Sequence, residues 1–166
     1  MRAALRRYEG PLTRYAAQIT GDAERARDVV QDTFVRLCAE EPARLDGHLA
    51  EWLFTVCRRR ALDVRRKESR MTALTETHLD TAECAGPSPS QAAERNESAG
   101  HALRLLATLP PNQREVVRLK FQAGLSYAEI SRVTELSVTN VGYLLHTALK
   151  TLRQRMPAET NLTAKL

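Results

Sequence analysis

Cationic side chains are concentrated in the stretch Trp52–Arg70. They are Arg58, Arg59, Arg60, Arg65, Arg66, Lys67 and Arg70. Within this stretch only Asp63 and Glu68 carry negative charge. Clustered cations bind anions, and the phosphates of a nucleic acid are the anions that a basic helix commonly meets. A basic run is also typical of a solvated helix surface, so the stretch by itself leaves both interpretations open.

A second candidate surface lies downstream. Ser126 and Glu129 have the spacing of a capping box, in which both side chains satisfy backbone N–H groups at a helix start. A short helix is then expected to reach a turn at Thr134–Leu136, and Ser137 can begin a longer helix. This succession predicts a helix-turn-helix, whose second helix enters the major groove of DNA. The residues expected to contact bases or phosphates are Arg132, Ser137, Val138, Thr139, Asn140, Tyr143 and Lys150.

Polar side chains define a third candidate surface. Asp28, Gln31 and Asp32 share one side of an expected helix between Asp22 and Glu40, at three- and four-residue spacing. Such a side can serve solubility, or it can be a docking surface for a partner protein. The periodicity does not choose between the two.

These surfaces require helices to position them, and the pattern predicts an all-α fold of two small helical domains joined by a flexible linker. A helix is expected over Ala3–Ile19, broken near Gly10-Pro11 because proline starts a helix more readily than it continues one. The second helix is followed by a long helix that ends near Arg70. The expected boundaries are 1–70 for the first domain, 71–98 for the linker, 99–156 for the helix-turn-helix domain and 157–166 for a tail.

The apolar side of the long helix is predicted from Leu49, Trp52, Leu53, Val56 and Leu62, which recur at helical spacing. In the second domain, Pro110-Pro111 is expected to end one helical segment and to start the next. The next helix should end at Gly124.

Composition limits the class of protein. The chain has 166 residues, 43% of them hydrophobic, and a formal net charge of +5, which favours an anionic partner. Three widely spaced cysteines form neither a disulfide framework nor a metal pair, which fits a reducing cytoplasm, and we expect Cys38 and Cys57 to fill the core. We find no signal peptide, membrane span, metal-ligand spacing or catalytic motif, so a non-enzymatic cytoplasmic protein without cofactor is expected.

The motifs together resemble a family. Asp28–Phe34, Trp52-Leu53 and Arg58–Arg66 look like the region-two domain of bacterial RNA polymerase sigma factors. Leu109-Pro110-Pro111, Arg114, Leu125–Ile130 and the apolar positions up to Leu152-Arg153 look like their region-four domain. Both domains in a chain of this length resemble the extracytoplasmic-function (ECF) subfamily.

The resemblance implies a mechanism in which the protein binds core RNA polymerase and enables promoter melting. Asp28, Gln31 and Asp32 would dock on the clamp helices of the β′ subunit. The minus-ten promoter element would be contacted by Arg58, Arg59, Arg60, Asp63, Arg65 and Arg66. The helix from Ser137 would read the minus-thirty-five element, and the same domain would pack on the β flap. The family is commonly regulated by an anti-sigma protein, and its free members are expected to be monomers.

The sequence departs from the family pattern in three places. Arg59 stands where asparagine is usual, Glu135 where glycine is frequent in the turn, and Gly142-Tyr143 where a cation and serine are frequent. An alternative function is an independent helix-turn-helix regulator, which predicts a homodimer on a palindrome. An enzyme acting on nucleic acid would need a carboxylate or metal cluster that the sequence does not offer.

Overall fold

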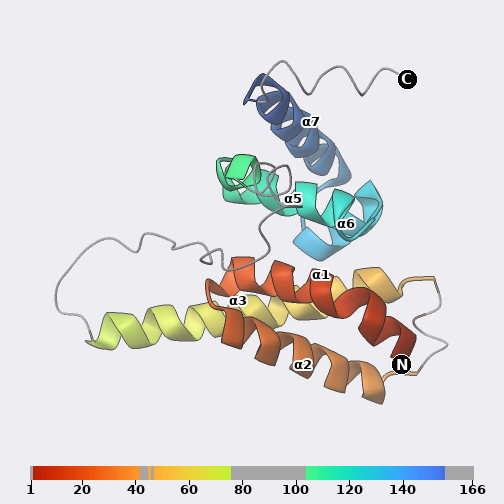
Figure 1. Cartoon of the computed structure of the whole chain (residues 1–166), viewed down its shortest axis with the longest axis vertical. Coiled ribbons are helices and arrows are strands. Elements are labelled where there is room, and N and C mark those ends of the chain that lie inside the picture. The colour runs from red at the N-terminus through yellow and green to blue at the C-terminus, as the bar shows by residue number, and fades with distance from the viewer. Residues whose placement is uncertain (1, 42–44, 46, 76–103, 156–166) are drawn as a thin grey trace, which may run out of the picture. The chain divides into compact units, whose positions relative to one another are not determined.

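The computed structural model describes residues 2–41, 45, 47–75 and 104–155. Every element in these ranges is a helix, as the sequence predicts (Figure 1). The chain divides into two compact units, the first containing α1, α2 and α3 and the second containing α5, α7 and most of α6. Most of the predicted linker, the tail, Asp46 and Cys84 lie outside the described residues. None of the described helices has the length and apolarity needed to cross a bilayer.

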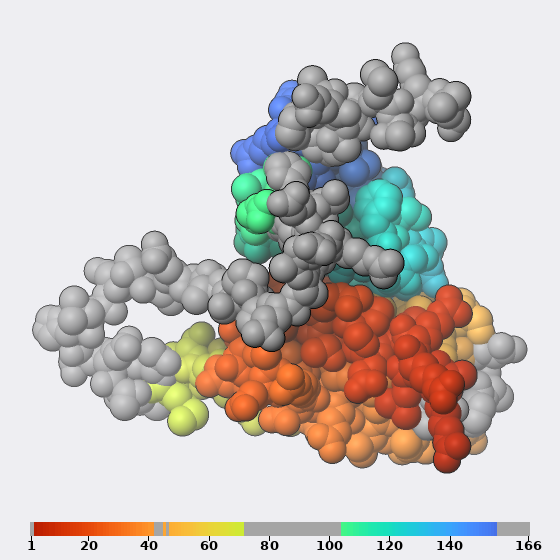
Figure 2. Space-filling view, in the orientation of Figure 1, coloured from red at the N-terminus to blue at the C-terminus, as the bar shows by residue number. Residues whose placement is uncertain are grey.

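In the first unit, α1 (Arg2–Thr20), α2 (Ala23–Ala39) and α3 (Leu49–Thr75) each pack on the other two. The surfaces of α1 and α2 meet along the face seen in Figure 2. Tyr15 of α1 and Phe54 of α3 form an edge-to-face aromatic pair with ring centroids 5.4 Å apart. The apolar side chains buried in this unit are Leu12, Tyr15, Ala16, Ala26, Val29, Val30, Phe34, Leu37, Leu53, Phe54, Cys57 and Ala61.

The predicted break in the first helix is wrong, because α1 continues through Pro11. A proline inside a helix removes one backbone hydrogen bond and costs about 3 kcal/mol. Directly after Pro11, Leu12, Tyr15 and Ala16 are almost fully buried, and this packing offsets the cost. Tertiary burial therefore overrides the local preference for a break.

The connection between α1 and α2 consists of a left-handed glycine and a capping aspartate. Gly21 has a φ of 75°, the left-handed conformation that ends helices, and the Asp22 carboxylate accepts a 2.8 Å hydrogen bond from the Arg25 backbone N–H. The end of α3 differs from the prediction, since this helix continues to Thr75. No glycine or proline follows Arg70 until Gly86, so the sequence contains no early stop.

The buried side of α3 is rotated from the predicted one. Leu53 is buried as expected, but Trp52 and Val56 are only half-buried. The core line instead runs through Leu53, Cys57 and Ala61, each of which has no exposed surface. The small side chains of Cys57 and Ala61 fit where the three helices approach one another. A prediction based on large apolar residues does not identify such positions.

In the second unit, a helical turn at residues 104–107 precedes α5 (Pro111–Phe121), which packs on α7 (Val138–Arg155). Pro111 is the first residue of α5, as predicted, because proline lacks the N–H that would be unpaired there. The Arg114 guanidinium donates hydrogen bonds to the carbonyl oxygens of Leu106, Ala107 and Leu109, at 3.1, 2.5 and 2.9 Å. Arg114 therefore ties the preceding turn to α5.

Local chemistry also defines the helix-turn-helix formed by α6 (Tyr127–Thr134) and α7. The capping box is present: the Ser126 N–H donates to the Glu129 carboxylate at 2.7 Å, and the Ser126 hydroxyl accepts from the Glu129 N–H at 3.3 Å. In the turn, the Ser131 hydroxyl donates to the Leu136 carbonyl at 2.5 Å. At the start of α7, the Ser137 hydroxyl accepts from the Asn140 N–H at 3.2 Å.

Glu135 lies in the left-handed conformation, with a φ of 63°. This conformation costs a residue with a Cβ about 1–2 kcal/mol, whereas glycine adopts it freely. We expect Glu135→Gly to make this turn about 1 kcal/mol more stable than Glu135→Ala, the control that removes the same side chain. Amide hydrogen exchange of α6 and α7 measures the difference. Equal protection in the two variants would show that no strain resides at this backbone position.

Candidate functional site

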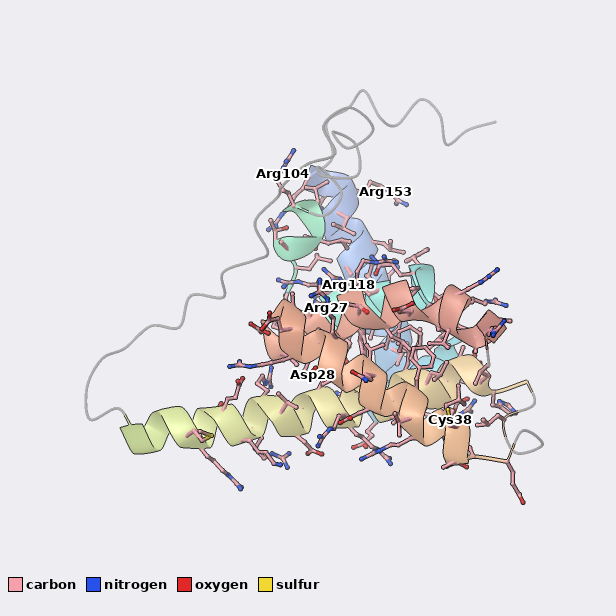
Figure 3. The ribbon with its side chains drawn as sticks, turned by 60° about the horizontal axis from the view of Figure 1, so that its bottom comes forward. Arg27, Asp28, Cys38, Arg104, Arg118 and Arg153 are labelled. Atoms are coloured by element: carbon pink, nitrogen blue, oxygen red, sulfur yellow. The ribbon has the colours of Figure 1, made fainter. Side chains whose placement is uncertain are left out.

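The exposed side of α2 carries the residues expected to dock a partner. Asp28 and Gln31 are exposed, and the same line continues through Val35 and Cys38 at four- and three-residue spacing. Figure 3 shows Asp28 and Cys38 along this helix. The prediction that Cys38 fills the core is wrong, because Cys38 is exposed at the edge of the apolar stripe. Val35 is 63% exposed. The candidate docking face, which we define as Asp28, Gln31, Asp32, Val35 and Cys38, therefore has an apolar centre beside its acidic groups.

The end of α3 projects beyond α1 and α2, as the yellow-green segment of Figures 1 and 3 shows, whereas Arg60 and Glu68 still contact α2. Arg59, Asp63, Arg66 and Arg70 recur along α3 at spacings of four, three and four residues, and all four are exposed. This spacing aligns them on one side of the helix, which we call the basic ridge. Arg70 was not among the predicted contact residues, although its spacing from Arg66 was a signal for it. The structure thus brings Arg59, Asp63 and Arg66 together.

The other predicted minus-ten residues lie beside the ridge. Arg58 and Arg65, seven residues apart, form a separate line in which Arg58 is half-buried and Arg65 exposed. Arg60 points to α2, where its Nε and one Nη lie 2.9 and 2.8 Å from Oδ2 of Asp32. Two residues predicted for different surfaces are therefore bonded to each other.

A second ion pair joins the same two helices. Arg25 at the start of α2 contacts Glu68 on α3. Arg25 precedes Asp32 by two helical turns, and Glu68 follows Arg60 by about two turns, so the pairs fit an antiparallel contact between α2 and α3. In the Arg60–Asp32 pair the cation belongs to α3, whereas in the Arg25–Glu68 pair the cation belongs to α2.

In α7 the predicted base-reading residues are exposed. Thr139, Tyr143, His146 and Lys150 recur at spacings of four, three and four residues on the side opposite the buried Val141 and Leu145. Within this line, Tyr143 is 67% exposed. His146, which is not among the predicted contact residues, lies between Tyr143 and Lys150 on this line.

The remaining predicted residues of this unit lie nearby in sequence. Val138 is 49% exposed, Asn140 is exposed, and the Ser137 hydroxyl caps the helix. Arg132 is exposed on α6. The first cation of α7 is Lys150, so the first three turns of this helix present hydroxyl, amide and aromatic groups in place of cations.

The departure from the family pattern at Gly142 lies against Tyr127. A Cβ at Gly142 would meet a ring carbon of Tyr127 at 3.8 Å, which is ordinary van der Waals contact. Packing therefore does not require glycine at this position. The Tyr127 ring is also covered by Lys120, whose Nζ lies 5.3 Å from the ring centroid and 3.3 Å from the Leu125 carbonyl oxygen.

Metal binding and nucleophilic catalysis are two other kinds of chemistry that side chains in the described part of the chain could support. Its histidine, cysteine and carboxylate side chains form no group of three or more that could hold a metal ion. Cys57 is buried as predicted, and desolvation raises the pKa of its thiol to about 12, with a smaller opposing effect from Thr33. Its thiolate is therefore scarce at neutral pH, and the residue is unsuited to act as a nucleophile.

Family models match both units. Residues 4–71 match sigma-70 region 2, and residues 102–152 match sigma-70 region 4. The two matches cover the acidic side of α2, the basic ridge and the helix-turn-helix.

Individual proteins agree with these matches. The chain is 32% identical over 159 residues to the ECF RNA polymerase sigma factor SigL of Mycobacterium tuberculosis, covering 92% of this chain and 86% of SigL. It is 28% identical over 156 residues to the ECF sigma factor SigM of Bacillus subtilis, covering 93% and 91% of the two chains. The sigma factor RpoE of Bartonella quintana, solved with the anti-sigma factor NepR, has a similar fold, with a TM-score of 0.67, 21% identity and coverage of 92% and 93%.

Proposed function

Because the chain belongs to the extracytoplasmic-function family of RNA polymerase sigma factors, we propose how its surfaces divide the steps of transcription initiation. The chain binds core RNA polymerase and recognises promoter DNA. We assign polymerase docking to α2, minus-ten contacts to α3, and minus-thirty-five contacts to α6 and α7. The observation that carries this assignment is the presence of both sigma regions in one chain.

The docking face on α2 is proposed to bind the clamp helices of the β′ subunit. Asp28 and Gln31 offer exposed acceptors, and Val35 offers apolar area between them and the helix end. Acidic groups around an apolar centre suit a partner that presents cations around an apolar groove.

The basic ridge is proposed to contact the minus-ten element as it melts. Its cations Arg59, Arg66 and Arg70 are exposed on one side of α3, where a DNA strand can approach. Each DNA surface alone is expected to bind weakly, since α7 has no cation in its first turns. Binding to one polymerase holds both surfaces at high effective concentration, which strengthens the pair.

Two further assignments rest on the family. A sigma factor acts as an initiation factor, so no catalytic step is assigned to this chain, and it acts in the cytoplasm with polymerase and promoter DNA. The related RpoE was solved with an anti-sigma factor. We infer that an anti-sigma protein also regulates this chain and competes with polymerase for it.

The proposed function is tested by capture of core bacterial RNA polymerase with the purified chain, followed by transcription of genomic fragments. A one-to-one complex with specific start sites is expected. A free homodimer that shifts palindromic duplex DNA without binding polymerase would instead support the independent regulator, which the matches to both sigma regions do not favour.

Cys38 provides a probe of the docking face. In a Cys84→Ser background, we expect iodoacetamide to modify Cys38 in the free protein and to modify it several-fold more slowly in the polymerase complex. Cys57 should remain unmodified in both states, because it is buried and its pKa is raised to about 12. Peptide mass spectrometry measures the modification, and unchanged Cys38 reactivity in the complex would contradict docking through this face.

Tyr143 is proposed to read thymine through its methyl group, since an exposed aromatic ring makes apolar contacts in the major groove. We expect Tyr143→Ala to reduce transcription that depends on the minus-thirty-five element by about tenfold. Replacing the contacted thymine with uracil, which removes only the methyl group, should weaken the native protein and leave the variant unchanged. Leu149→Ala, a change of another exposed apolar residue on α7, serves as the control.

A further inference from the structure

Arg60 differs from the other cations of α3 in its direction. The ridge residues Arg59 and Arg66 lie on the exposed side, whereas Arg60 is half-buried and bonded to α2. Its Nε and one Nη both donate to Oδ2 of Asp32, at 2.9 and 2.8 Å. A guanidinium bonded in this way points two of its five N–H donors at the carboxylate on α2.

The geometry leaves part of Asp32 open to a partner. Both bonds from Arg60 end on Oδ2, and the Asp32 side chain is 47% exposed. A carboxylate accepts about four hydrogen bonds, so Oδ1 keeps its capacity to accept. The Asp32 carboxylate is therefore fixed in one orientation while it can still bind a second donor.

The Arg25–Glu68 pair extends this arrangement along α2 and α3. Asp28 lies between Arg25 and Asp32 on α2, one turn from each. The two pairs fix α2 against α3 on either side of Asp28, the exposed acid of the docking face.

The Arg60–Asp32 pair is not built mainly for stability. The two side chains are 34% and 47% exposed, and ion pairs with this degree of solvation add little to the free energy of folding. The pair does reduce the rotamer freedom of Asp32 before a partner arrives. A partner that binds the ordered carboxylate then loses less conformational entropy on association.

We propose that Arg60 is a positioning residue of the polymerase-docking face, which orients Asp32 for a cationic or N–H donor of the polymerase, and that Arg60 does not contact promoter DNA. The proposal rests on the proposed function, because it requires Asp32 to contact polymerase. It reassigns Arg60, which the sequence pattern placed among the minus-ten contacts, and leaves DNA contact to the ridge.

The test compares Arg60→Gln with Arg66→Gln, which removes the same charge from the ridge. The affinity of each full-length variant for core bacterial RNA polymerase is measured without DNA. The affinity of each holoenzyme for a single-stranded minus-ten oligonucleotide is measured separately. Arg60→Gln should weaken polymerase binding by roughly threefold to tenfold, the effect of one side chain losing its preorganisation. Oligonucleotide binding should be weakened by Arg66→Gln and unchanged in Arg60→Gln.

A double-mutant cycle separates positioning from a general structural effect. If Arg60 acts through Asp32, Arg60→Gln should have no further effect on polymerase affinity in an Asp32→Asn background. Thermal unfolding should be nearly the same in all variants, and Arg60→Lys, which keeps the charge without the planar fork, should restore polymerase affinity only in part.

One outcome would reject the inference about Arg60, and another would reject the assignment of Asp32 to polymerase docking. Native polymerase affinity in Arg60→Gln, together with oligonucleotide binding as weak as that of Arg66→Gln, would show that Arg60 contacts DNA and would overturn the inference. Native polymerase affinity in Asp32→Asn would instead remove Asp32 from the docking face, and with it the proposed role of Arg60.

Discussion

Asp32→Arg is expected to abolish binding of the chain to core RNA polymerase while leaving its fold intact. The substitution replaces a docking carboxylate with a cation and places that cation beside Arg60, its former ion-pair partner. Loss of a desolvated charge pair in an interface costs about 2–5 kcal/mol, which corresponds to a roughly 30-fold to 4,000-fold weaker complex. Fluorescence anisotropy of the labelled chain with core polymerase measures this loss.

The fold should survive the Asp32→Arg change because the core residues of α2 point to the other side. Val29, Val30 and Leu37 remain buried, and only a half-exposed ion pair is lost. Circular dichroism and thermal unfolding check this expectation. Glu9→Arg, the same charge reversal at an exposed position of α1, is the matched control and should bind polymerase normally. Normal binding by Asp32→Arg as well would remove Asp32 from the docking face.

The sequence predicted the starts of α5 and α6 well, because these depend on neighbouring residues. The Ser126–Glu129 capping box and the start of α5 at Pro111 both form as expected. Each of them satisfies backbone groups within a few residues, so its chemistry is visible without knowledge of the tertiary fold.

The errors occurred where packing between helices decides the structure. Pro11 does not break α1, since the residues after it are buried against α2 and α3. The core line of α3 passes through Cys57 and Ala61, whose small size matters only once the neighbouring helices are known. The orientation of Arg60 likewise depends on the register of α2 against α3, which no periodicity within a single helix contains.

The sequence therefore predicted the basic segment as a helix, but it did not predict the direction of each side chain. The cations of the basic stretch point in three directions. Arg66 lies on the ridge, Arg65 lies on the separate line with Arg58, and Arg60 is directed to α2. One helix thus meets three different environments, and a prediction that treats all its cations alike assigns them a single function. Only the ridge combines exposure with a common side of the helix.

The triple change Arg59→Gln, Arg66→Gln and Arg70→Gln is expected to block promoter opening while the holoenzyme still forms. Each cation on a single strand contributes about −0.7 to the slope of log affinity against log salt, so the slope should fall by about 2. The ratio of native to variant affinity for a single-stranded minus-ten oligonucleotide should then shrink roughly 20-fold between 50 and 200 mM salt.

The control for the ridge is the triple change Arg2→Gln, Arg6→Gln and Arg14→Gln, which removes the same net charge from exposed positions of α1. If the ridge binds DNA through local contacts, this control should keep the native salt slope and should open the promoter. The same fall in slope in both variants would mean that the net positive charge attracts DNA without a specific surface. A native slope in the ridge variant would place the minus-ten contacts elsewhere on the first unit. The line of Arg58 and Arg65 would be the next candidate, because it lies on the same helix.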